Sequence, residues 1–142
     1  MTDGLPEWLR AQLDTDERIA RAVPVDLGHE WSDPGPWIIA GPGGGGREAE
    51  VAKAADGLEM PLAEAVAHHI AAHDPARVLR EIEAKRAIIA RYEFACREAG
   101  RLDLAEEKRE VWVQVAGALQ SCVACLAAIY ADRPGYDEAV LP

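Results

Sequence analysis

Apolar residues recur every three or four positions over much of the chain, which is the pattern of helices with one buried face. Residues 5–23 form the first such stretch, and Pro24 stops it. Asp3 suits the N-cap of this helix, and Pro6 suits its first turn. The side chains that we expect on its buried face are Leu5, Trp8, Leu9, Leu13, Ile19 and Val23.

A short helix and a long helix meet at Asp74-Pro75. Asp is a favoured N-cap and Pro is favoured directly after it, so the chain is expected to end one helix near His73 and begin another at Asp74. The short helix covers residues 61–73. Its expected buried side chains are Leu62, Val66 and Ile70.

Residues 74–131 predict an antiparallel hairpin of two long helices that turns near Gly100. Each helix is on the order of 40 Å long, more than a chain of this mass needs for its own core. We therefore expect the hairpin to dimerise and cover its apolar stripe. The stripe of the first helix is Val78, Ile82, Ile89, Tyr92 and Cys96, and that of the second is Leu104, Val111, Val115, Ala118, Cys122, Cys125 and Ile129.

Residues 25–57 break the helical pattern with prolines and with the glycine-rich run 41–46. Short apolar pieces between these breaks predict a small β-hairpin or a three-stranded sheet. The glycine run is expected to be a turn, because it lacks the Lys-Ser or Lys-Thr of a phosphate-binding loop. The whole pattern predicts a mostly α, α+β fold in one domain, residues 1–142, with a tail at 132–142 that folds back.

Charge and cysteine content narrow the function classes. The 142 residues include 25 Asp and Glu against 15 Lys and Arg, a formal net charge of -10. Nucleic-acid binding needs clustered Lys and Arg, so direct binding to DNA or RNA is disfavoured. The three cysteines are an odd number, and the N-terminal residues lack an export signal. We expect a cytoplasmic protein with free thiols.

The segment from Val111 to Ala131 carries no charge over 21 residues, which is long enough to cross a bilayer. Gln114, Gln120 and Ser121 interrupt it, and no basic anchor flanks it. We therefore expect no membrane span. The preferred interpretation is a helix buried on most sides, in a bundle core or an oligomer interface.

Three stretches resemble a family of small actinobacterial and actinophage proteins that is known only as a domain of unknown function. The central stretch is His69-Ile70-Ala71-Ala72-His73-Asp74-Pro75-Ala76-Arg77-Val78-Leu79-Arg80-Glu81-Ile82-Glu83-Ala84-Lys85-Arg86. The other two are Trp8 to Ala20 and Tyr130 to Tyr136. The resemblance implies a cytoplasmic accessory protein, often encoded by a prophage. It implies no reaction and no catalytic residues.

A pair of histidines and a pair of cysteines could together form a zinc site. His69 and His73 lie four residues apart, and Cys122 and Cys125 lie three apart, so each pair shares one helical face. Antiparallel pairing of the hairpin would bring the pairs near each other. The alternative, which we favour, is that the cysteines are core residues and the histidines flank the Asp74 cap.

A catalytic interpretation would use His73 as a general base with Asp74 or Glu64 orienting it. Neighbouring His and Asp point in different directions on a helix, and Asp74 already serves as a cap. A metal-dependent hydrolase at these histidines is therefore the third hypothesis.

The leading hypothesis is a non-enzymatic protein that binds a host or phage protein through a helical oligomer. Trp31 and Trp37, which lie beside prolines, are the candidate contact residues for that partner. The second hypothesis is an intersubunit pocket for a small ligand such as a signalling nucleotide. The residues expected to line it are Arg77, Arg80, Tyr92 and Trp112.

Overall fold

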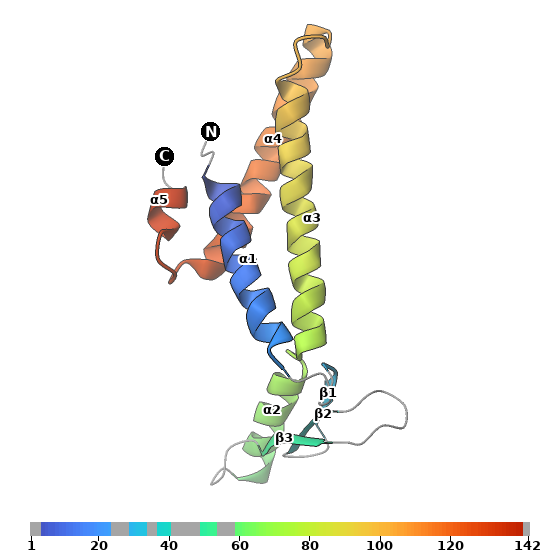
Figure 1. Cartoon of the computed structure of the whole chain (residues 1–142), viewed down its shortest axis with the longest axis vertical. Coiled ribbons are helices and arrows are strands. Elements are labelled where there is room, and N and C mark those ends of the chain that lie inside the picture. Colours follow the sequence, from blue (N-terminus) through green and yellow to red (C-terminus); the bar gives the residue numbers. More distant parts are fainter. Residues whose placement is uncertain (1–3, 24–28, 34–36, 41–48, 54–58, 141–142) are drawn as a thin grey trace. The chain divides into compact units, whose positions relative to one another are not determined.

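The computed structural model describes residues 4–23, 29–33, 37–40, 49–53 and 59–140, and confirms a mostly helical α+β fold (Figure 1). The chain divides into two compact units. The helical unit contains residues 1–15 and 82–142, and the sheet unit contains residues 16–81. The elements, in order, are α1 (Leu5–Arg21), β1 (Trp31–Ser32), β2 (Trp37–Ala40), β3 (Ala49–Lys53), α2 (Met60–Ala71), α3 (Pro75–Ala99), α4 (Glu106–Ala127), η2 (Ala128–Tyr130) and α5 (Tyr136–Val140).

The predicted helical hairpin is formed by α3 and α4, which lie side by side in opposite directions (Figure 1). At its turn, the Gly100 N–H donates to the Cys96 carbonyl at 3.1 Å. Arg101 closes the turn, donating to Asp103 at 2.6 and 3.0 Å and to Glu98 at 3.0 Å. These hydrogen bonds raise the pKa of Arg101 and lower the pKa of Asp103.

The core of the helical unit takes buried side chains from α1, α3, α4, η2 and α5. Leu5, Leu9 and Leu13, spaced four residues apart, form the buried row of α1. Ile82, Ile89 and Tyr92 of α3 are buried as predicted; the other buried residues of this unit are Ala95, Ala116, Val123, Ala127, Tyr130 and Ala139. Small side chains in α4 let neighbouring helices approach closely.

The end of the chain returns to α1, as expected for the tail. The Trp8 indole Nε1–H donates to the Pro134 carbonyl at 3.0 Å, and the rings of Trp8 and Tyr136 lie 5.8 Å apart. Gly135, between Pro134 and Tyr136 in the sequence, has φ +81°, and a Cβ on it would lie 3.0 Å from Trp8 Nε1. Glycine fits this turn because it tolerates the left-handed backbone and leaves room for the indole.

Two ion pairs connect α1 to α3 within the helical unit. Arg10 pairs with Glu93 at 2.5 Å, and Arg86 pairs with Asp14 at 2.6 Å. The hydrogen bond from Arg10 lowers the pKa of Glu93, and the same bond raises the pKa of Arg10. Both pairs are partly exposed, so each contributes modestly to stability.

The sheet unit contains a three-stranded antiparallel sheet in the order β1-β2-β3. Trp31 of β1 lies opposite Ala40 of β2, and the pairing of β2 with β3 is irregular between Ile38 and Ile39. Ile38 and Ala67 form a small core, and Trp31 and Ile70 pack against it. This is the three-stranded form of the two predicted alternatives.

Two predictions about buried faces are wrong. In α2, the buried row is Ala63, Ala67 and Ala71, whereas Leu62 and Val66 are exposed. Alanines allow a helix to lie close to a sheet, and this close approach favours the alanine face over the leucine face. In α1, the row through Leu5, Leu9 and Leu13 turns Ile19 outward, where it is 64% exposed.

Candidate functional site

The outer face of α4 is an apolar surface that is exposed in the single chain. Apolar residues that recur in a heptad pattern form this face and continue into η2. We call them the α4 stripe: Val111, Val115, Ala118, Cys122 and Cys125 of α4, and Ile129 of η2. All are exposed except the half-buried Val115; Val111 and Ile129 are each 58% exposed.

The inner face of α4 is a different row of residues. Ala116, Val123 and Ala127 are its buried side chains. Trp112 meets Phe94 of α3 edge to face, with ring centroids 5.5 Å apart. The helix is apolar on both faces because its sequence is uncharged from Val111 onward. A burial of α4 on most sides within the single chain, the bundle-core alternative, is therefore wrong, and burial in an oligomer interface stays a prediction.

The segment Glu106–Tyr130 is long and apolar enough to cross a membrane, and only 11% of its most apolar stretch is buried. The core helix of a soluble protein meets the same criteria of length and composition but is mostly buried. Exposed apolar helix faces are usually covered by another protein surface or by lipid, so these are the two candidates for the outer face of α4.

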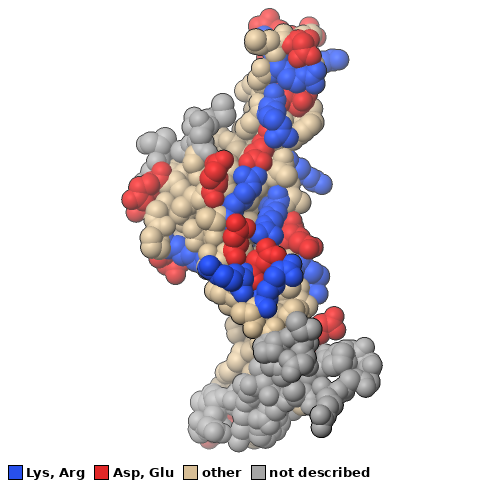
Figure 2. Space-filling view, viewed as in Figure 1, with Lys and Arg blue, Asp and Glu red and all other residues tan. Residues whose placement is uncertain are grey.

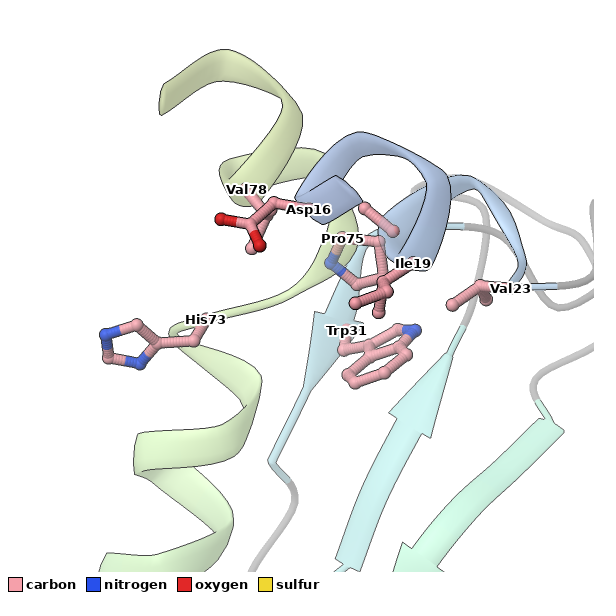
Figure 3. Close-up of a pocket in the computed structure, with 8 residues that line it drawn as sticks. Asp16, Ile19, Val23, Trp31, His73, Pro75 and Val78 are labelled. Carbon is pink, nitrogen blue, oxygen red and sulfur yellow. The ribbon is translucent and has the colours of Figure 1, made fainter. Parts of the chain in front are cut away.

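A second candidate site lies in the sheet unit, where an apolar cleft of about 350 Å³ surrounds Trp31. Figure 3 shows the Trp31 ring below Ile19, with Val23 to one side and the His73 ring pointing away from the group. Asp16 is the acidic residue of the lining. The remaining lining residues are Ala20, Pro75 and Val78. Sequence reasoning found Trp31 but missed its neighbours, because they come from two other segments, residues 16–23 and 73–78.

Asp74 connects β1 to the start of α3, next to this cleft. Its Oδ1 accepts the Arg77 backbone N–H at 2.6 Å, which confirms the predicted cap. Its Oδ2 accepts the Trp31 backbone N–H at 3.3 Å, and the Ala76 N–H donates to the His29 carbonyl at 3.0 Å. Both carboxylate oxygens therefore hold backbone groups, which leaves Asp74 poorly placed to orient His73 as a base.

The predicted metal ligands form two pairs, the histidines in the sheet unit and the cysteines in the helical unit. His69 and His73 have ring centroids 4.5 Å apart, and His73 Nδ1 lies 2.7 Å from the His69 carbonyl. Cys122 and Cys125 are free thiols exposed on the α4 stripe. Among the residues that the structure describes, no group of three or more His, Cys, Asp or Glu could hold a metal ion. The prediction that the cysteines are core residues is wrong.

The four residues expected to bind a small ligand also fall into two pairs. In the sheet unit, Arg77 donates to Glu81 at 2.8 Å and to the Ala72 carbonyl at 2.7 Å, and Arg80 is exposed. In the helical unit, Tyr92 is buried and lines a cleft of about 370 Å³ between α3 and α4. Trp112 is half-buried against Phe94. The structure thus shows two separate settings for these side chains.

The other predicted contact residue, Trp37, has its backbone in β2 opposite Lys53. Its side chain lies outside the described part of the chain, as does the glycine-rich run 41–46. Figure 2 shows basic and acidic side chains interleaved along the helices, so neither sign forms a continuous tract on the part of this face that is described.

One protein-family model, described as a family of unknown function (DUF6221), matches residues 2–142, and the chain belongs to that family. No curated protein and no solved structure matches the chain.

Proposed function

We propose that this member of the family acts without turnover, by binding protein through a helical oligomer in the cytoplasm. The observation that supports the proposal is the exposure of the α4 stripe, since long exposed apolar faces ordinarily mark binding surfaces. From the resemblance of its sequence motifs, we further propose that it is an accessory protein of actinobacteria or their phages. Its partner would then be a host or phage protein.

Protein suits the outer face of α4 better than lipid does. The inner face of α4 contacts α3, which carries charged residues such as Arg91, Glu93 and Arg97 along this region. Entry of the hairpin into a bilayer would place those charges in hydrocarbon, and each costs about 2.5–3.5 kcal/mol near the centre of a membrane. A second protein surface would cover the α4 stripe without that cost.

The test is an arginine substitution on the stripe and a matched one elsewhere. Ala118 on the α4 stripe and Ala90 on α3 are both exposed alanines inside long helices. We expect Ala118→Arg to convert the oligomer to a monomer, because it buries an unpaired charge, while Ala90→Arg keeps the oligomer. Light scattering gives the mass, and circular dichroism checks that the helices persist.

A monomeric parent chain would contradict the proposed oligomer, as would an Ala118→Arg variant of unchanged mass. Partition of the parent chain into a detergent phase would contradict the cytoplasmic assignment and favour lipid as the cover.

A small-ligand binder is the second candidate function, and the Trp31 cleft favours it, since its volume of about 350 Å³ is within the range of ligand pockets. Affinity capture from the native host, followed by mass measurement of proteins and small molecules, separates the two functions. A stoichiometric co-purifying protein supports the first. A nucleotide in every subunit would favour the second.

A further inference from the structure

We infer that the α4 stripe packs against the same stripe of a second copy of this chain. The two helices run antiparallel, and the twofold axis crosses them at the level of position 120. The inference rests on the proposed self-association and adds to it the partner, the direction and the register. A twofold interface uses one surface twice, so the surface must be complementary to itself. The stripe meets this requirement in both size and charge.

The positions of the stripe residues are symmetric about position 120. In an antiparallel pair, residues equally distant from the axis oppose each other, so Val111 packs against Ile129 of the second copy. In the same way Val115 opposes Cys125, and Ala118 opposes Cys122. Branched side chains thus meet at both ends, where Val111 and Ile129 are exposed, and small side chains meet in the middle. Small residues at the centre let the two helix axes approach closely.

The charges that border the stripe favour the same direction. Lys108 and Asp132 are exposed and lie 12 positions to either side of position 120. An antiparallel pair brings the first turn of α4, which contains Lys108, to the end of the other copy where Asp132 lies in the turn after η2. A parallel pair would instead place Lys108 against Lys108 and Asp132 against Asp132. Charges at the edge of an interface mainly select orientation and register.

Crosslinking of the full chain distinguishes the two directions. In a background with Cys96→Ser and Cys122→Ser, one variant keeps Cys125 alone, and a second carries Val115→Cys with Cys125→Ser. In the inferred register, Cys125 of the first variant opposes position 115 of the second, whereas like positions lie about 15 Å apart along the axis. We expect a short bis-maleimide to crosslink the mixture of the two variants, and neither variant alone.

A parallel pair reverses that result, because Cys125 then faces Cys125, and crosslinking of the Cys125 variant alone would overturn the inference. A dimer by light scattering that gives none of these products also overturns the register, while it leaves the proposed self-association intact. A monomeric mixture, with each variant folded by circular dichroism, would contradict both.

Charge reversal supplies an independent readout. Lys108→Glu should raise the dissociation constant of the dimer by about two- to five-fold at low salt, and the double variant Lys108→Glu/Asp132→Lys should restore it. In a parallel pair the double variant would not restore the dissociation constant, because Glu at position 108 would face Glu and Lys at position 132 would face Lys. Absence of rescue in a dimeric double variant therefore argues against the antiparallel direction.

Discussion

At the scale of single residues, Asp74 accepts one backbone hydrogen bond on each of its two carboxylate oxygens. One oxygen caps α3 through the Arg77 N–H, and the other holds the Trp31 N–H of β1. We expect Asp74→Ala to lower the free energy of unfolding by about 1–2 kcal/mol, because it leaves both N–H groups without this acceptor. Urea denaturation measures the change. Asp74→Asn is the control, since its amide oxygen still caps the helix, and equal losses in both variants would argue against the cap.

The ion pair of Arg10 with Glu93 gives a pH-dependent contribution. The pKa of Glu93 is lowered below its ordinary value, so its stabilising effect is present above about pH 4 and is lost as the pH falls through the folded-state value. Arg10→Gln should therefore reduce the free energy of unfolding at pH 7 by less than about 1 kcal/mol, given the partial exposure of the pair. The difference between parent and variant should shrink as the pH falls below the ordinary glutamate pKa of about 4.3. A difference that persists there would mean that packing of the Arg10 stem matters more than the charge.

At the scale of elements, helix ends were predictable from local chemistry. The Asp74-Pro75 pair sets the start of α3, and Gly100 follows its last residue. These signals act within a few residues, so they can be read from the sequence directly. The three-stranded sheet was one of two predicted forms, because the length of its edge strand depends on contacts that local chemistry does not determine.

The buried faces of helices were less predictable where a helix is apolar on more than one side. In α4, every residue from Val111 onward is uncharged on all sides of the helix, so periodicity alone does not tell which row faces α3. In α2, the choice lay between a leucine-valine row and an alanine row, and the sheet decides it through Ile38. The stripe itself was recognised from the sequence, but which row of α4 packs against α3 depends on tertiary packing.

A pair of substitutions tests the face of α2. Ala67 is fully buried in the core with Ile38, so Ala67→Val should overfill the site and cost about 1–3 kcal/mol. Val66, its neighbour in sequence, is exposed, and Val66→Ala should change the free energy of unfolding by less than about 0.5 kcal/mol. Thermal and urea denaturation of both variants provide the measurement. The opposite order of effects would restore the face first expected from the sequence.

At the scale of the whole molecule, contacts between the first and last helices complete the helical unit. Trp8 donates to the Pro134 carbonyl and lies beside Tyr136. Trp8→Phe keeps an aromatic ring but removes the N–H donor, so we expect a loss of about 1 kcal/mol in the free energy of unfolding. Tyr136→Phe should be closer to the parent, because the contact recorded for Tyr136 is through its ring. A Trp8→Phe variant as stable as the parent would show that the hydrogen bond adds nothing.

The contact of α1 with residues far along the chain affects how the protein folds during translation. Leu5, Leu9 and Leu13 leave the ribosome well before the residues around Pro134 that contact Trp8. The α3–α4 hairpin, by contrast, closes through neighbouring residues and can form as it emerges. Until Pro134 and Tyr136 have emerged, α1 therefore remains an apolar segment without the residues it packs against, and nascent chains of this protein should be substrates for ribosome-associated chaperones.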